Sequence, residues 1–119
     1  MLRDVVRALF RFISNATPTL DDFKSHGALG KRMRRDQDDP DAVRRWHDGI
    51  SVFDDFARAC ELAPGLGFGW IATIALEDSA GYEVSQYGRD RHHYTIFGEP
   101  EQLMALVSEV RTVPRAQRD

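Results

Sequence analysis

The residues best suited to chemistry lie in one run, Arg89-Asp-Arg-His-His-Tyr94, where a polar loop meets a predicted strand at 92–97. Histidine has an unperturbed pKa close to neutrality, so it can act as an acid, a base or a metal ligand. Arginines beside it could hold a phosphate or carboxylate through paired hydrogen bonds. His92 and His93 are therefore candidate catalytic groups. The candidate ligand-binding groups of this run are Arg89, Arg91 and Tyr94.

Strand geometry limits what the two histidines can do together. Side chains at successive positions of a strand point to opposite faces of the sheet, so His92 and His93 cannot serve one compact site. His92 shares its face with Tyr94 and Ile96, and His93 shares the other with Thr95 and Phe97. Either face can be the one that borders a cleft.

Two further polar residues are candidates for the same site. Ser51 lies in a predicted strand at 50–53 and is a candidate catalytic residue, but the sharp turn of a nucleophile elbow is missing around it, so an acyl-transfer triad is poorly supported. His26 is a candidate ligand-binding group in the last turn of a predicted helix that ends at Gly27, where the helix dipole favours its charged form. A metal site would need His26, His47 and one of the histidine pair to converge, and no short-range ligand spacing indicates this. We predict neither a metal nor a cofactor.

Composition restricts the class of protein. A chain of 119 residues with 42% hydrophobic residues fits one domain. The net charge of −3 argues against general affinity for nucleic acid, which depends on clustered Lys and Arg. Cys60 is the only cysteine, which excludes an intrachain disulfide and indicates a reducing cytoplasm. No apolar segment approaches the ~20 residues of a membrane span.

The N-terminus carries a helical pattern. At 100° per residue the apolar side chains of residues 2–13 fall on one arc, opposite a basic stripe of Arg3, Arg7 and Arg11. We expect an amphipathic helix within residues 1–14. It would dock on the core, bind a partner protein or a second copy of the chain through the face from Leu2 to Ile13, or lie on an anionic membrane.

The remaining pattern predicts an α+β fold in a single compact domain. We expect a small mixed sheet of about four to five strands, packed by the N-terminal helix and a C-terminal helix. A strand, a helix capped by Asp54 or Asp55, and a second strand form a predicted crossover unit. Residues 107–113 either extend the C-terminal helix or form a last strand. The predicted elements are a helix from Pro40 to Gly49, strands at 50–53, 70–76, 82–86 and 92–97, and helices at 55–63 and from Pro100.

A charged loop is expected at 28–41. Its basic half, Lys31-Arg-Met-Arg-Arg35, runs directly into an acidic half that ends at Asp41. Opposite charges this close in sequence fold back on each other or stay solvated, so nucleic acid is an improbable partner. Residues 114–119 are expected to be a disordered tail.

Three blocks of the sequence carry a resemblance. They are Asp21-Asp-Phe-Lys-Ser-His26, Trp46-x-x-Gly49-Ile-Ser-Val-Phe53 and His93-Tyr-Thr-Ile-Phe-Gly-x-Pro100-x-x-Leu103. Together they resemble a group of small, uncharacterised bacterial proteins, over about residues 18–110. The resemblance implies a bacterial, cytoplasmic, stand-alone domain and no particular activity.

A shorter segment resembles another fold. A strand bearing Ser51, an alanine-rich helix and an apolar strand are similar to the central unit of ADP-ribosyltransferase-like domains, which bind NAD. In such enzymes an early Arg or His and a late Glu accompany the Ser or Tyr. Here only Ser51 matches, since Glu99 and Glu101 lie at a helix start and His26 lies on a predicted helix.

These observations support two classes of function. The first is a binding or interaction module with an anion-accepting polar surface, for a partner protein or a nucleotide-like small molecule. The second is a small nucleotide- or NAD-dependent transferase or hydrolase, with His92 or His93 as acid and base. A cleft that gathers His26, Ser51, one of these histidines and an arginine would favour the enzyme. A third hypothesis, one half of a toxin–antitoxin or immunity pair, rests on the size and the implied bacterial character and on no particular residue.

Overall fold

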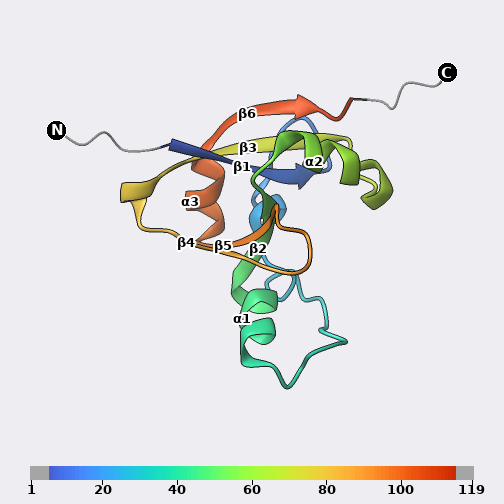
Figure 1. Cartoon of the computed structure of the whole chain (residues 1–119), viewed down its shortest axis with the longest axis vertical. Coiled ribbons are helices and arrows are strands. Elements are labelled where there is room, and N and C mark those ends of the chain that lie inside the picture. Colours follow the sequence, from blue (N-terminus) through green and yellow to red (C-terminus); the bar gives the residue numbers. More distant parts are fainter. Residues whose placement is uncertain (1–5, 115–119) are drawn as a thin grey trace.

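The first described element is a strand where the basic stripe predicts a helix. The computed structural model describes residues 6–114, and in it Val6–Ile13 forms strand β1 (Figure 1). The predicted amphipathic helix is therefore wrong over this stretch, and residues 1–5 lie outside the described part. The predicted binding of a partner, or of a second copy of the chain, depended on that helix and is therefore not supported over residues 6–13.

The spacing of the arginines explains the error. Arg7 and Arg11 are four residues apart, which fits one face of a helix and also one face of a strand. Burial separates the two cases: Leu9 and Ile13 are buried on one face of β1, and Phe10 is buried on the other. A strand that is apolar on both faces belongs in the middle of a sheet.

The sheet has six strands in the order β4-β5-β2-β1-β3-β6, and every pair of neighbours is antiparallel. The prediction of a mixed sheet with four to five strands is therefore wrong in both respects. The last strand, β6, settles the open assignment of residues 107–113 in favour of a strand. Besides β1, the strands are β2 (Gly49–Phe53), β3 (Trp70–Glu77), β4 (Glu83–Gln86), β5 (His93–Phe97) and β6 (Val107–Thr112).

The predicted strand-helix-strand unit is present with one strand inserted. Helix α2 (Phe56–Leu62) connects β2 to β3. Each of these strands pairs antiparallel with β1, so they run parallel to each other on its two sides. In the sheet, β1 lies between β2 and β3, so the unit connects two strands that are not direct neighbours.

Helix α1 begins where an acidic cap and a proline predict it, and α3 begins where a proline predicts it. The Asp39 side chain accepts hydrogen bonds from the backbone of Asp41 at 3.0 Å and of Ala42 at 3.5 Å, and caps α1 (Pro40–Asp48). Helix α3 (Pro100–Ala105) also starts at a proline. No helix within residues 6–114 has the length and the apolar composition to cross a membrane.

The helix predicted to end at Gly27 is mostly absent. Only a short 3-10 helix, η1 (Leu20–Phe23), forms there, and it starts with Asp22 bonded to the backbone N–H of Thr19 at 2.8 Å. The chain then turns toward α1, where the Ser25 hydroxyl donates to the carbonyl of His47 at 2.5 Å. This tertiary bond replaces the helical turn that local pattern favours.

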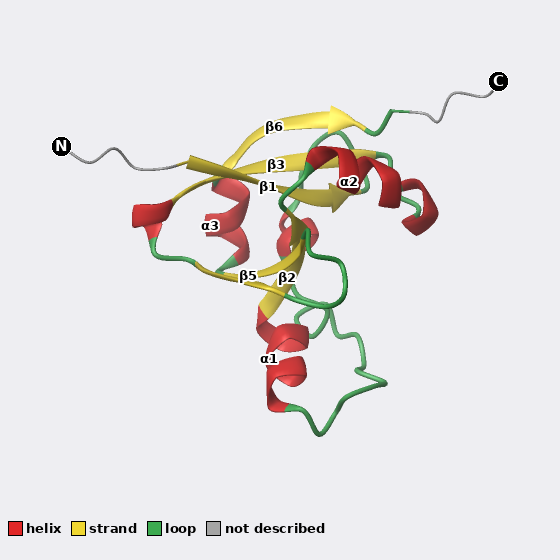
Figure 2. Ribbon diagram, in the orientation of Figure 1, coloured by secondary structure: helices red, strands yellow, loops and turns green. Residues whose placement is uncertain are grey.

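The curved sheet wraps around α3 and η1, and α2 covers its other face (Figure 2). The main core lies on the α3 side and contains Phe23, Leu103 and apolar residues of strands β1, β2, β3 and β5. A smaller core lies under α2, where Phe10 and Phe53 pack with Ala59 and Ile71.

The sheet nearly divides between β1 and β2. These strands share a single bridge, Phe10 with Phe53, whereas β1 pairs with β3 along its whole length. Arg11 bridges the gap, since it donates to the carbonyl of Asp22 and to that of Ser51, each at 2.9 Å. Burial lowers the pKa of Arg11 to about 10, against the opposing effect of Asp22, so the guanidinium is still charged at neutral pH.

Candidate functional site

A cleft of about 1160 Å³ opens beside this gap, and we call it the basic groove. Its floor is the sheet face that carries Phe12, Ser51, Phe53, His93 and Thr95. Its walls come from α1, from the segment that follows α2, from Tyr87, and from the chain between β1 and α1. The wall residues used below are His26, Leu29, Lys31, Met33, Arg45, Trp46, Leu66, Phe68 and Tyr87.

The wall formed by residues 24–36 is attached to α1 by hydrogen bonds at several points. The N–H of Gly27 donates to the carbonyl of Trp46 at 2.8 Å, and the indole N–H of Trp46 donates to the carbonyl of Lys31 at 3.0 Å. Gly27 is required at this contact because a Cβ there would overlap the His47 side chain and approach its Cα to 2.9 Å. The loop therefore holds a defined position beside Trp46.

Positive charge dominates the groove even though the chain carries a net charge of −3. Seven basic side chains line it against three aspartates. Among residues 6–114 no ion pair involves the run Lys31–Arg35, so its charges stay solvated and the acidic run after it does not neutralise them. The basic residues are Arg11, Lys24, Lys31, Arg32, Arg34, Arg35 and Arg45, and the acidic ones are Asp21, Asp22 and Asp36.

Two consecutive arginines of α1 differ in their pairing. Arg44 lies 3.8 Å above the ring of Phe97 and makes a bidentate bond to Glu83 at 2.6 and 2.7 Å, which holds the pKa of Glu83 below its usual value. Arg45 lies 3.6 Å above the ring of Tyr87 in the groove, and within the described residues its buried Nε has no hydrogen-bond partner. The guanidinium of Arg44 therefore has a carboxylate partner, whereas the Nε of Arg45 has no hydrogen-bond partner in the described residues.

His26 packs against the indole of Trp46, with ring centroids 4.5 Å apart. Desolvation, followed by the charges of Lys31 and Arg11, lowers the pKa of His26. The expected helix-dipole effect was in the opposite direction, and it is absent because η1 ends at Phe23, before His26. His26 is therefore biased toward its neutral form.

Of the two adjacent histidines, His93 is the one that faces the groove. Its Nδ1 lies 2.9 Å from the carbonyl of Tyr87, and its ring packs between Phe53 and Tyr87 at 5.2 and 5.7 Å. A carbonyl only accepts hydrogen bonds, so Nδ1 carries the proton and Nε2 is the unprotonated nitrogen of the neutral ring. His93 thus offers a base or an acceptor.

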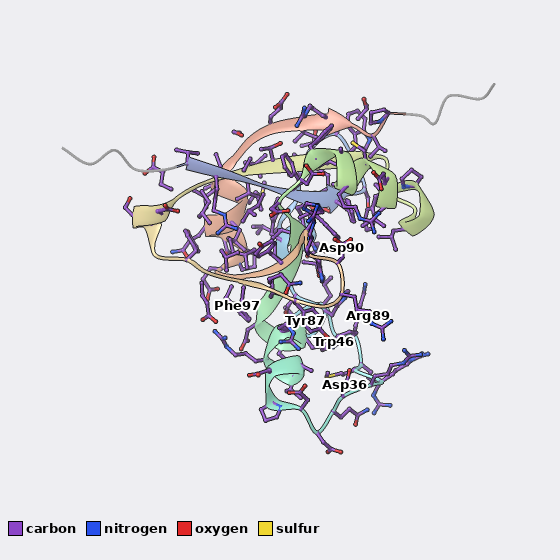
Figure 3. The ribbon with its side chains drawn as sticks, viewed as in Figure 1. Asp36, Trp46, Tyr87, Arg89, Asp90 and Phe97 are labelled. Carbon is purple, nitrogen blue, oxygen red and sulfur yellow. The ribbon has the colours of Figure 1, made fainter. Side chains whose placement is uncertain are left out.

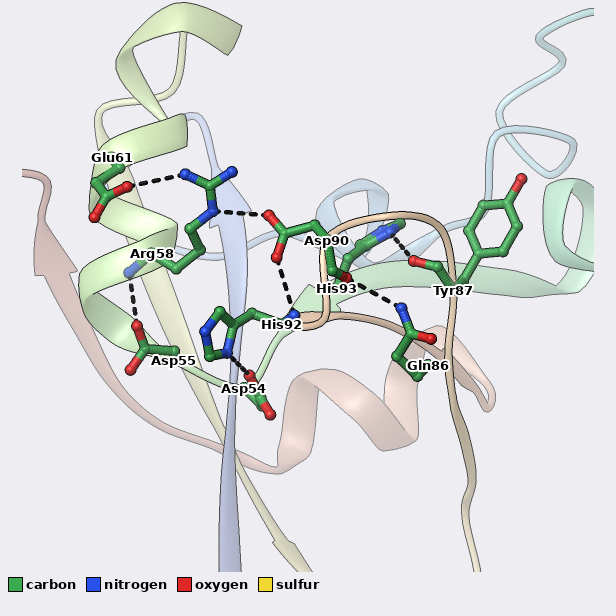
Figure 4. Close-up of polar contacts among 9 residues, drawn as sticks. All are labelled: Asp54, Asp55, Arg58, Glu61, Gln86, Tyr87, Asp90, His92 and His93. Atoms are coloured by element: carbon green, nitrogen blue, oxygen red, sulfur yellow. Dashed lines mark hydrogen bonds and ion pairs between the residues drawn. The ribbon is translucent and has the colours of Figure 1, made fainter.

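His92 belongs to a different polar cluster, which fastens the loop before β5 to the start of α2 (Figure 4). Its Nδ1 lies 2.8 Å from the carboxylate of Asp54. Asp90 accepts from the backbone N–H of His92 at 2.9 Å and from Arg58 at 2.7 Å, and these bonds, in that order, lower the pKa of Asp90. The two histidines point to different sides, but β5 begins at His93, so His92 lies in the turn before the strand in which it was predicted.

The structure therefore brings together part of the predicted site. His26, Ser51 and His93 all line the groove. The side chain of Tyr94 is on the opposite sheet face, next to the main core and 5.4 Å from the guanidinium of Arg7. Arg89 and Arg91 are exposed and do not line the groove, nor does His92.

Sequence reasoning missed the residues that give the groove its character. Arg45, Trp46 and Tyr87 come from α1 and from the end of β4, and Figure 3 shows Trp46 and Tyr87 on the side of the sheet nearer α1 and the charged loop. Their only signal was an Arg-Arg-Trp run on a helix. Nothing local to that run indicates that Tyr87 packs against it.

Chemistry at the groove has two structural limits. In the described part of the chain, no group of three or more His, Cys, Asp or Glu side chains is placed to hold a metal ion. Over the same residues, no hydrogen bond joins the Ser51 hydroxyl to a histidine. A ready nucleophile–base pair is therefore not assembled.

Comparisons with protein-family models, curated proteins and solved structures find no match to this chain.

Proposed function

We propose that this protein is a binding module whose basic groove accepts an anionic group of its partner. The observation that carries the proposal is Arg45, a guanidinium held on the ring of Tyr87 with a buried, unpartnered Nε. Among the described residues no hydrogen bond or ion pair engages this guanidinium, so its other N–H groups are available to an incoming carboxylate or phosphate. Stacking also fixes the guanidinium plane before binding, which favours bidentate recognition.

The surrounding charges support the same proposal. The run Lys31–Arg35 lies on the wall of the groove without an acidic partner in the described chain. Clustered cations of this kind raise the local concentration of anions and speed their association, an effect that salt weakens. Arg45 would fix the anion, and the loop would attract it.

The proposal is tested with inorganic triphosphate as the probe, followed by NMR titration of the backbone amides. Replacing Arg45 with alanine should weaken binding by about tenfold to a hundredfold, because charge-assisted hydrogen bonds contribute about 1.5–3 kcal/mol. Replacing Arg44, which already has Glu83 as its partner, should change the affinity by less than about threefold.

The matched arginines make the result decisive. Equal weakening in the two variants would mean that triphosphate responds only to general positive charge and would contradict the proposal. Failure of the unmodified protein to bind triphosphate, or shifts confined to residues outside the groove, would contradict it as well.

A second candidate function has one observation in its favour. His26, Ser51 and His93 converge in one groove with Arg45, which is the arrangement expected of a small nucleotide- or NAD-dependent transferase or hydrolase. In that function the unprotonated Nε2 of His93 would act as the base. These residues do not form an assembled catalytic site, since the Ser51 hydroxyl has no hydrogen bond to the ring of His26 or of His93.

Thermal unfolding with NAD distinguishes this second function. A hundredfold excess over Kd adds about 2.7 kcal/mol to the stability of a protein that binds NAD. The enzyme hypothesis expects such a shift, and expects it to vanish in folded Ser51→Ala and His93→Ala variants. No shift with NAD, ATP or GTP counts against it and leaves the binding module standing.

A further inference from the structure

We infer that the anionic partner is an acidic polypeptide segment that also carries apolar side chains. This inference rests on the proposed function, because it names the class of partner that the basic groove would accept. Two observations support it: the groove has an exposed apolar surface, and its aromatic rings are already stacked on other side chains.

Exposed apolar side chains gather at the groove. Among residues 6–114, three of the five exposed large hydrophobic residues line it: Leu66 at 60% exposure, Leu29 at 40% and Tyr87 at 38%. An apolar patch with a polar rim is typical of a protein-binding surface. Leu29 and Leu66 offer aliphatic surface. Apolar side chains of a bound polypeptide would cover this surface, whereas phosphates or sugars would leave it exposed to water.

The composition of the walls points the same way. Aromatic residues, methionine and arginine are enriched at protein interfaces, and binding hot spots favour Trp, Tyr and Arg. The groove presents Arg45, Trp46 and Tyr87 next to Met33. A cation beside an aliphatic surface matches a segment in which Asp or Glu alternates with apolar residues.

The aromatic rings do not offer the free stacking faces that single-stranded nucleic acid uses. Trp46 already stacks on His26, Tyr87 carries the guanidinium of Arg45, and Phe53 is only 7% exposed. Phe12 stacks between Phe53 and Phe68, with centroids 5.3 and 5.6 Å away.

A random dodecapeptide display library tests the inference. The unmodified protein is used for selection and the Arg45→Ala variant for counter-selection. We expect the enriched peptides to combine Asp or Glu with apolar residues. One enriched peptide, synthesised and titrated, should bind about tenfold more weakly to Arg45→Ala and about five- to tenfold more weakly to Leu66→Ser. Leu20→Ser is the matched control, because Leu20 is 39% exposed but does not line the groove, and it should not weaken binding.

A twelve-residue thymidine oligonucleotide is titrated in parallel. If the oligonucleotide binds with the same dependence on Arg45 while no peptide does, the anion-binding groove is supported and its assignment to a polypeptide is overturned. Enriched peptides that lack acidic residues, or that bind the Leu66→Ser variant unchanged, also overturn it. If neither probe binds, the inference fails, and the triphosphate titration separately decides whether the groove binds anions at all.

Discussion

Replacing Phe23 with alanine should lower the free energy of unfolding by about 3–5 kcal/mol, the largest effect we expect from a single truncation. Phe23 is 1% exposed and is the largest fully buried side chain in the described part of the protein. It ends η1 and packs with Leu103 of α3 and with the inner face of the sheet. Removing the ring would leave a cavity where helix and sheet meet.

Chemical denaturation monitored by tryptophan fluorescence measures this loss. Leu20→Ala is the control on the same 3-10 helix, and since Leu20 is exposed its effect should stay within about 0.5 kcal/mol. A Phe23→Ala variant that loses less than about 1 kcal/mol would show that η1 does not close the core. The prediction also concerns the groove, because η1 presents the Asp22 carbonyl that accepts from Arg11.

Where local signals were strong, the sequence was sufficient to predict the element. The Asp39-Pro40 pair predicted the start of α1, and the Asp54-Asp55 pair predicted the start of α2. The structure selects Asp55 as the cap, since its side chain accepts from the N–H of Arg58 at 3.0 Å. The apolar run from Trp70 to Leu76 predicted a strand covered on both sides, which β3 is. In each case the deciding interaction lies within a few residues or within one strand.

The two ends of the described fold needed partners that are distant in sequence. β1 has hydrogen-bonding neighbours in β2 and β3, which follow it by tens of residues, and its four-residue arginine spacing suits a helix equally well. β6 likewise becomes a strand by pairing with β3, where Val110 faces Ala72. Periodicity alone does not distinguish helix from strand in short apolar segments.

In the candidate site, too, local sequence predicts some features, and contacts between distant residues decide the others. Strand alternation predicted that only one of the adjacent histidines would reach a given site. His93 lines the groove, whereas His92 lies in the turn before β5 and contacts Asp54. Arg44 and Arg45 are equivalent in sequence, and only the packing of α1 across β4 and β5 gives Arg44 a carboxylate and leaves Arg45 without one. A site made by tertiary packing leaves no local pattern.

Replacing Gly49 with alanine should cost about 1–3 kcal/mol and weaken anion binding together with stability. Gly49 joins α1 to β2, and its N–H donates to the carbonyl of Arg45. A Cβ at this position would overlap the Thr95 methyl and lie 3.0 Å from Cε1 of Phe97. Gly65→Ala is the control, since nothing lies within 4 Å of a Cβ there and no loss of stability is expected.

A double-mutant cycle separates this overlap from other effects of the extra methyl group. Thr95→Ser removes the methyl that the new Cβ would meet, so Gly49→Ala combined with Thr95→Ser should be more stable than the sum of the single changes predicts, by about 0.5–2 kcal/mol. Simple additivity would contradict the proposed overlap. Because Gly49 is bonded to the residue that carries the unpaired guanidinium, triphosphate affinity should recover with stability in the double variant. Recovery of stability without affinity would mean that α1 refits against the sheet with Arg45 displaced from Tyr87, and would show that the stacked geometry, rather than the charge alone, binds the anion.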